Sequence, residues 1–289
     1  MSPKQNAFEC HQVMDPLHLV SYFTPEVDGR FTALGLDTPR MRYLAGRAAA
    51  LGPVGAGVVT ATFYTFNPGT VAEIVPRAWH IASPADILAA RVDGVDEALR
   101  RLLGDELVGS AEVVEAAALA RRATEACTPE GRALYAAHAE LEWPKAPHMV
   151  LWHAITLLRE HRGDGHLAAL LNHGLGGLAA IITDGATGNG LLAREETQAL
   201  RGWSGEQWDV EAAALTERGL LDDDGVLTEA GRAVRAAVEE DTNTAAAEPY
   251  RALGVADSER LRRLCLPLSR VVLDAGVLPG GAGRQITAA

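Results

Sequence analysis

The segment from residue 194 to residue 241 constrains the fold most, because its helix signals and turn signals alternate at short spacing. Helical patterns cover Arg194–Arg201 and Glu206–Arg218, and Ser204 between them is a typical N-cap residue. The sequence LLDDDGVLT follows, with an Asp-Gly dipeptide between two short apolar runs, and predicts a β-hairpin. Another helix is predicted over Thr228–Asp241. Helix, turn, helix, hairpin and helix is the order of a winged helix.

The rest of the chain predicts further helices. Capping residues and apolar spacing place them at about 11–23, 38–51, 84–103, 110–127, 129–142, 147–162, 165–172 and 257–275. The stretch Gly52–Pro68 is compatible with a strand or a buried helix. Pro144 and Pro147 indicate a domain boundary, which gives domains at 1–143 and 144–289. We therefore expect a mainly α protein, with an N-terminal helical domain and a winged-helix-like C-terminal domain that carries a short β-hairpin wing.

Two resemblances support this order of elements. The segment LTERGLLDDDGVLTEAGRAVRAAVEE resembles the second helix, wing and following helix of MarR-type regulators, through Leu215, Arg218-Gly219-Leu220, Asp224-Gly225, Leu227-Thr228 and Gly231. Nearly the whole chain resembles actinobacterial helix-turn-helix proteins of unknown role, through YFTPE, GRAAALGPVGAGVV, FYTFNPG and LWHAITLLREHRGDGHLAAL. The first resemblance implies a homodimer paired through terminal helices, and neither supplies an activity.

The charge argues against DNA as a partner. The chain has a net charge of −12, and residues 204–241 hold 11 acidic residues but only three arginines. Because affinity for a duplex depends on neutralising phosphates, such a surface is repelled by DNA. Winged helices also serve as packing and dimerisation modules, and the composition favours that interpretation.

The cellular setting follows from three absences in the sequence. The N-terminus, MSPKQNAFECHQ, has no apolar core of a signal peptide, and no run approaches 18 apolar residues. The three cysteines are far apart and form no close metal spacing. We expect a cytoplasmic protein with reduced thiols and no membrane partner.

Histidines are concentrated on one predicted helix. Five of the nine histidines lie between residues 148 and 173. On a helical wheel, one sector of the 147–162 helix holds His148, Trp152, His153, Thr156, Arg159 and Glu160. A solvated face is the simplest interpretation, but such faces are usually rich in Lys, Glu and Gln. A ligand-lined pocket and a subunit interface are the two alternatives.

If the sector lines a pocket, its residue types suggest roles. His153, Glu160 and His161 are the candidate catalytic residues, because a carboxylate beside a histidine orients the ring for acid–base chemistry. The candidate ligand-binding residues are His11, Tyr64, His148, Trp152, Thr156, Arg159, Arg162 and His166. His18, Tyr22 and Glu26 could line the same cavity. Asp164 either caps a helix that restarts at Gly165 or pairs with Arg162 or His166.

Metal binding is poorly specified, because the chain has neither HExxH nor CxxC. A haem or a metal ion held through one of the histidines stays open. Three functions fit the sequence. The first is a small-molecule-binding protein or enzyme of specialised metabolism that uses the 148–166 helix. The second is a ligand-responsive winged-helix transcription regulator, and the third is a non-catalytic dimeric scaffold.

Overall fold

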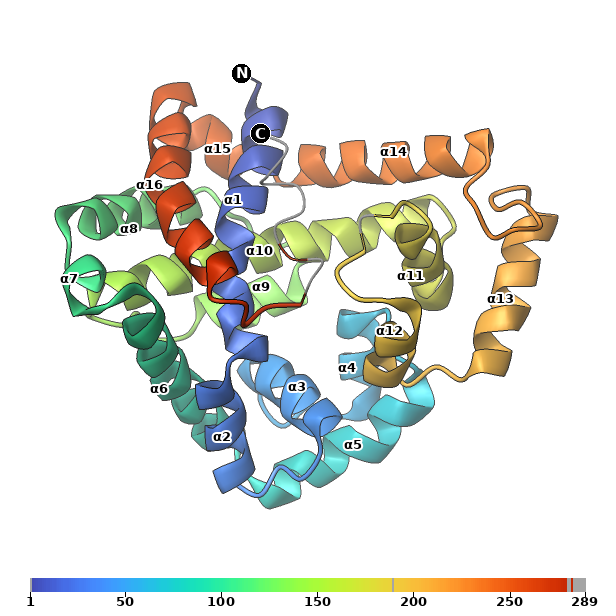
Figure 1. Cartoon of the computed structure of the whole chain (residues 1–289), viewed down its shortest axis with the longest axis horizontal. Helices are drawn as coiled ribbons and strands as arrows, with labels where there is room; N and C mark the ends of the chain where they lie inside the picture. Colours follow the sequence, from blue (N-terminus) through green and yellow to red (C-terminus); the bar gives the residue numbers. More distant parts are fainter. Residues whose placement is uncertain (1, 189, 280–281, 283–289) are drawn as a thin grey trace.

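The computed structural model describes residues 2–188, 190–279 and 282, and almost all of its regular structure is helical (Figure 1). The first nine α-helices are α1 (Pro3–Phe23), α2 (Pro25–Ala33), α3 (Pro39–Ala48), α4 (Ala56–Phe63), α5 (Pro68–Ile81), α6 (Pro84–Leu103), α7 (Asp105–Val108), α8 (Ala111–Thr124) and α9 (Ala133–Ala139). They are followed by α10 (Pro147–Asn172), α11 (Gly177–Gly185), α12 (Arg194–Arg201), α13 (Gly205–Glu217), α14 (Glu229–Ala245), α15 (Glu248–Leu253) and α16 (Val255–Asp274). A short 3₁₀ helix, η1 (Ala49–Leu51), extends α3.

The helix starts follow the capping signals of the sequence. Ser83, Ser204 and Thr228 each accept a hydrogen bond from a backbone amide in the first turn of α6, α13 and α14. The helices predicted at 84–103, 110–127 and 257–275 are confirmed with small shifts of their ends. The stretch from Gly52, which was compatible with a strand or a helix, contains α4.

The predicted β-hairpin wing is wrong. The described residues contain no β-strand, and one isolated antiparallel bridge, Leu221 to Leu227, lies between α13 and α14. The Asp222 carboxylate accepts hydrogen bonds from the backbone amides of Asp224 and Val226, at 3.1 and 2.9 Å. These bonds close a tight turn, and Thr228 already caps α14. Too few residues remain on either side of the turn to form a ladder.

The predicted break of the histidine helix at residues 163–165 is also wrong, because α10 is continuous to Asn172. A Cβ atom on Gly165 would lie 2.8 Å from a guanidinium nitrogen of Arg132 and 2.9 Å from the Cβ atom of Ala245. Gly165 is therefore needed for close packing of these two side chains on α10, not for a turn.

Two hydrophobic cores share α10. The larger core joins α1, α3, α5, α6, α8, the first part of α10, α15 and α16. The smaller core joins the end of α10, α11, α13, the turn before α14, and α14. In Figure 1, α10 crosses the centre of the molecule and α13 lies at the right-hand edge. The division at 143/144 stays a prediction, and the cores group the residues differently.

The turn after α4 connects the two cores. Tyr64 has a φ of 43°, and its hydroxyl donates a hydrogen bond to the carbonyl of Leu175 at 2.7 Å. A Cβ atom on Gly177 would lie 2.0 Å from the Tyr64 carbonyl oxygen, so only glycine allows this approach. Of the described helices, none on its own has the length and apolar character to cross a membrane, although two sharply bent helix pairs meet those criteria jointly.

Candidate functional site

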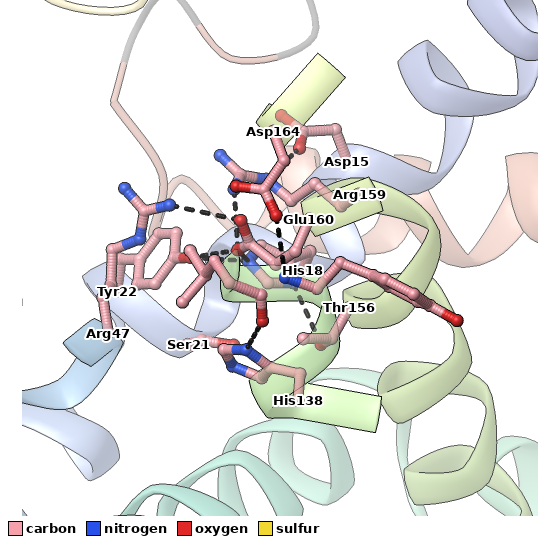
Figure 2. A network of polar contacts seen from close by, with 12 residues as sticks. Asp15, His18, Ser21, Tyr22, Arg47, His138, Thr156, Arg159, Glu160 and Asp164 are labelled. Carbon is pink, nitrogen blue, oxygen red and sulfur yellow. Dashed lines mark hydrogen bonds and ion pairs between the residues drawn. The ribbon is translucent and has the colours of Figure 1, made fainter. Parts of the chain in front are cut away.

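A polar network lies where α1 crosses α10 (Figure 2). Trp152 and Thr156 are one helical turn apart on α10 and both face α1. The Trp152 indole donates a hydrogen bond to the Ser21 hydroxyl at 2.8 Å, and the Thr156 hydroxyl donates to the Trp152 carbonyl at 2.9 Å. The predicted sector of α10 is therefore buried against a neighbouring helix and is not a solvated face.

The hydrogen bonds of the network fix the protonation of His18. Because the Thr156 hydroxyl already donates to a carbonyl, its oxygen accepts from the Nδ1–H of His18 at 3.1 Å. The Nε2 atom of His18 is then unprotonated and accepts from the Tyr22 hydroxyl at 2.6 Å. Burial, together with the guanidinium groups of Arg159 and Arg47, holds the pKa of His18 well below its usual value. The ring is neutral at physiological pH.

Glu160 is the anionic centre of the network, although only 3 % of the residue is exposed. Its carboxylate accepts from Arg159 at 3.0 Å and from Arg47 at 3.4 Å, and lies 3.4 Å from the Tyr22 hydroxyl. Burial alone would raise the pKa of Glu160, but the two guanidinium groups lower it to about 2. Figure 2 shows Arg47 and Arg159 approaching the carboxylate from different elements.

Beyond Glu160 the network opens into a cavity of about 360 Å³. Both cores contribute to its wall, because α1, α3 and α10 meet α11, α12 and α14 there. Five arginines, four carboxyl groups and two histidines are among its lining residues. They are Arg47, Arg159, Arg162, Arg201, Arg235, Glu160, Asp164, Asp184, Glu239, His11 and His166. The rest of the wall is mainly apolar side chains and threonine.

Most of these charges neutralise one another. Besides the Glu160 pairs, Arg162 contacts Glu239 at 2.6 Å and Arg235 contacts Asp184 at 2.9 Å. Arg201 is the exception, since within the described part of the chain its guanidinium has no carboxylate within ion-pair distance. The guanidinium lies 4.5 Å from the ring centroid of Phe66, and its Nε atom is buried without a hydrogen-bond partner. Arg201 is thus an unneutralised cation in the cavity wall.

Asp164 is one helical turn after Glu160 on α10. Its carboxylate accepts a hydrogen bond from the Tyr135 amide at 2.9 Å and so caps the N-terminus of α9. Neither predicted role occurs, because α10 does not restart at Gly165 and Asp164 forms no ion pair with Arg162 or His166 in the described residues. Burial, assisted by the charge of Glu160, raises the pKa of Asp164 to about 6.

The predicted site residues divide into three groups. Glu160, Arg159, Arg162, His11 and His166 line the cavity, and Trp152 and Thr156 belong to the network behind it. The remaining four, His148, His153, His161 and Tyr64, are outside the cavity lining. The structure therefore brings together one of the three candidate catalytic residues and four of the candidate ligand-binding residues at the cavity.

Two of the histidines outside the cavity, His153 and His161, are packed as neutral rings. His153 lies edge-on to Trp143, with ring centroids 4.7 Å apart, and His161 lies edge-on to Tyr135 at 5.3 Å. Burial is the largest cause that lowers the pKa of each ring to about 4, and nearby arginines add to it. His148 contacts Asp96 at 2.5 Å, and burial lowers its pKa as well. His153 and His161 have no carboxylate partner among the described residues, so the arrangement expected for a histidine base is absent there.

Sequence reasoning missed Arg47, Arg201, Arg235 and Asp184, all of which line the cavity. Each lies on a helix that meets α10 only in the folded chain, so no local spacing connects it with Glu160. A partial signal existed for Arg47, which lies within the stretch GRAAALGPVGAGVV.

The described residues contain no group of three or more His, Cys, Asp or Glu side chains arranged to hold a metal ion. A haem with one axial histidine needs no such group, and that alternative stays a prediction.

Comparison with known proteins places the chain in a family. A family model described as helix-turn-helix family matches residues 7–279, and the protein belongs to this family. No curated protein and no solved structure gives a significant match. These comparisons do not bear on the MarR-type and actinobacterial resemblances or on a homodimer, which stay predictions.

Proposed function

We propose that this protein binds a small anionic molecule in the arginine-lined cavity between its two cores. The observation that carries the proposal is Arg201, a cation in the cavity wall that has no acidic partner in the described chain. A guanidinium presents a planar set of donors that matches a carboxylate or a phosphate, and such charge-assisted bonds are strong in a poorly solvated site.

The distribution of charge supports an anion over a neutral ligand. The chain as a whole carries a net charge of −12, yet its cavity has five arginines against four carboxyl groups. One of the four, Asp164, has a pKa raised to about 6 and is partly neutral in weak acid. An anion that enters the cavity is attracted locally even though the outer surface repels it.

The properties of Glu160, which the sequence suggested as a catalytic residue, favour a binding site over a catalytic site. Glu160 has a pKa lowered to about 2, and so is a weak base at neutral pH. The two arginines fix the position of the Glu160 carboxylate, and the carboxylate in turn fixes the two guanidinium groups. In this arrangement Glu160 positions the guanidinium groups of Arg47 and Arg159 at the cavity wall.

The test is isothermal titration calorimetry with inorganic phosphate, acetate and succinate, against the wild type and Arg201→Gln. We expect at least one of these anions to bind the wild type, and Arg201→Gln to weaken it about tenfold or more, since a charged hydrogen bond contributes roughly 1.5–3 kcal/mol. Arg30→Gln is the matched control, because Arg30 is half-buried, pairs with Asp93 and Glu97 and lies outside the cavity lining. No binding of any of the three anions to the wild type contradicts the proposal.

The family supports a second candidate, a ligand-responsive transcription regulator. In a helix-turn-helix regulator of this element order, α13 would be the recognition helix. Its exposed side chains include Glu206, Asp209 and Glu217. These carboxylates repel a duplex, which is why the regulator is the second candidate. A mobility-shift assay at low salt with the DNA upstream of its own gene tests it, and a salt-sensitive shift would move it to first place.

A further inference from the structure

The cavity contains two ionisable side chains of opposite sign that lack an ion-pair partner in the described part of the chain, Arg201 and Asp164. The other four arginines and three carboxylates of the cavity pair with one another, as described above. A ligand that enters the cavity can therefore meet two unneutralised charges without breaking an existing pair.

Asp164 is buried, with 7 % of the residue exposed, and forms no ion pair among the described residues. The guanidinium of Arg132 lowers the pKa of Asp164 through its charge, but it donates its hydrogen bonds to the carbonyls of His161 and Ala245. The Tyr135 amide is a neutral donor, and the Glu160 carboxylate one turn away repels a second negative charge. A buried carboxylate in such surroundings gains most from a cation supplied by the ligand.

We infer that the ligand is zwitterionic, with a carboxylate that binds Arg201 and an ammonium group that binds Asp164. This inference rests on the proposed function and narrows its substrate class from small anions to small amino acids. The cavity volume of about 360 Å³ is at the lower end of the usual range for small-molecule pockets and suits such a ligand.

Asp164 and Arg201 have different roles if the ligand is zwitterionic. A carboxylate without an amino group uses Arg201 alone, whereas an amino acid uses both side chains. The amino acid should therefore bind more tightly than the carboxylate of the same chain length, and the difference should depend on Asp164.

The experiment compares matched probe pairs by calorimetry: β-alanine with propionate, 4-aminobutyrate with butyrate, and 6-aminohexanoate with hexanoate. We expect the amino acid of one pair to bind at least tenfold more tightly than its partner, and the best chain length reports the span between the two groups. Asp164→Asn should abolish this advantage while keeping carboxylate affinity, because an asparagine oxygen still accepts from the Tyr135 amide. Arg201→Gln should weaken both members of the pair.

The outcomes distinguish a failure of the zwitterionic ligand from a failure of the proposed anion binding. If carboxylates bind and no amino acid binds more tightly than its partner, the inference is wrong and the proposed function stands. If no probe binds, both fail. An amino-acid advantage that survives in Asp164→Asn also overturns the inference.

A second readout does not depend on any variant. An ammonium group beside Asp164 lowers its pKa from about 6, so amino-acid binding at pH 6 should release a fraction of a proton. Calorimetry in two buffers with different ionisation enthalpies measures this release. Burial is the largest cause that holds the pKa of His11 at about 4 and that of His166 at about 3, so neither ring contributes at pH 6. Proton uptake in place of release would contradict an ammonium group at this position.

Discussion

Two buried carboxylates, Glu160 and Asp164, lie one helical turn apart on α10 and have opposite electrostatic surroundings. Around Glu160 the chain supplies two guanidinium groups, a phenol and a neutral imidazole, and the charge is neutralised. Around Asp164 it supplies the backbone amides of Leu134 and Tyr135 and, among the described residues, no cation within ion-pair distance. Since both residues are buried, the difference lies in what surrounds them, and it separates a structural charge from one that is available to a ligand.

The largest effect is expected from Glu160→Gln. This change leaves the half-buried guanidinium groups of Arg47 and Arg159 with less negative charge to balance them, and only Arg159 keeps a second partner, Asp15. Breaking one side of a buried pair costs about 3–5 kcal/mol. Urea unfolding should show this loss of stability. The control is Glu97→Gln, at an exposed partner of Arg30, which should change stability by less than about 1 kcal/mol. A loss at Glu160 no larger than in the control would show that the network is not neutralised in the way described.

A smaller effect than at Glu160 is expected from Gly165→Ala, which tests the packing against α10 next to Asp164. The added methyl group meets Arg132 at 2.8 Å and Ala245 at 2.9 Å, and such overpacking costs about 1–3 kcal/mol. Gly163→Ala, two residues earlier on the same helix, is the matched control. Its nearest neighbour would be a Glu160 oxygen at 3.6 Å, so the higher helix propensity of alanine should stabilise the protein by up to about 1 kcal/mol. Equal effects of the two changes would contradict the packing at Gly165.

The pH dependence of stability sharpens the comparison between the two carboxylates. Because Asp164 has its pKa raised from 3.8 to about 6 in the folded state, its contribution to stability is full below pH 3.8 and is lost as the pH rises through 6. The loss is about 2–3 kcal/mol. Glu160 has its pKa lowered from 4.5 to about 2, so it contributes stability above pH 4.5 and loses it as the pH falls towards 2.

The measurement is urea unfolding of the wild type and Asp164→Asn at pH 4 and at pH 7. Asparagine resembles the neutral acid at both values, so the variant should gain on the wild type between pH 4 and pH 7. A constant difference between the two proteins would mean that Asp164 titrates normally.

The sequence predicted the helices well because their signals are local. Ser204 caps the helix that it was expected to cap, Ser83 and Thr228 cap helices that begin next to their predicted starts, and Pro at the first helical position marks others. The hairpin failed because the side chain of Asp222 binds the backbone amides that a ladder would have used, a competition that an apolar pattern does not show. The break at 163–165 failed because a glycine signals a turn or a close contact equally well.

The candidate site was predicted in part for the same reason. The polar sector of the α10 wheel identified Glu160 and Arg159, and Arg162 was named as a ligand-binding candidate from the same helix. His153 and His161 were also named as catalytic candidates, since burial against Trp143 or Tyr135 cannot be read from spacing. Arg47 and Arg201, the two cavity arginines on which the argument depends, come from helices that are distant from α10 in sequence and reach the cavity only in the folded chain. Pairing of charges is a tertiary property, and an unpaired charge can be recognised only after all the others have found partners.

The smallest effect on stability is expected at Arg201, and its sign is informative. The cation has no carboxylate partner in the described chain, and burial, together with the guanidinium of Arg47, lowers the pKa of Arg201. Arg201→Gln should therefore leave the unliganded protein unchanged or stabilise it by roughly 0.5 kcal/mol, while anion binding is lost. Thermal unfolding with and without 10 mM succinate measures both quantities in one series. A residue of a binding site can lower the stability of the unliganded protein and raise that of the complex. If Arg201→Gln instead destabilises the unliganded protein, Arg201 serves the fold and the contrast with Glu160 is lost.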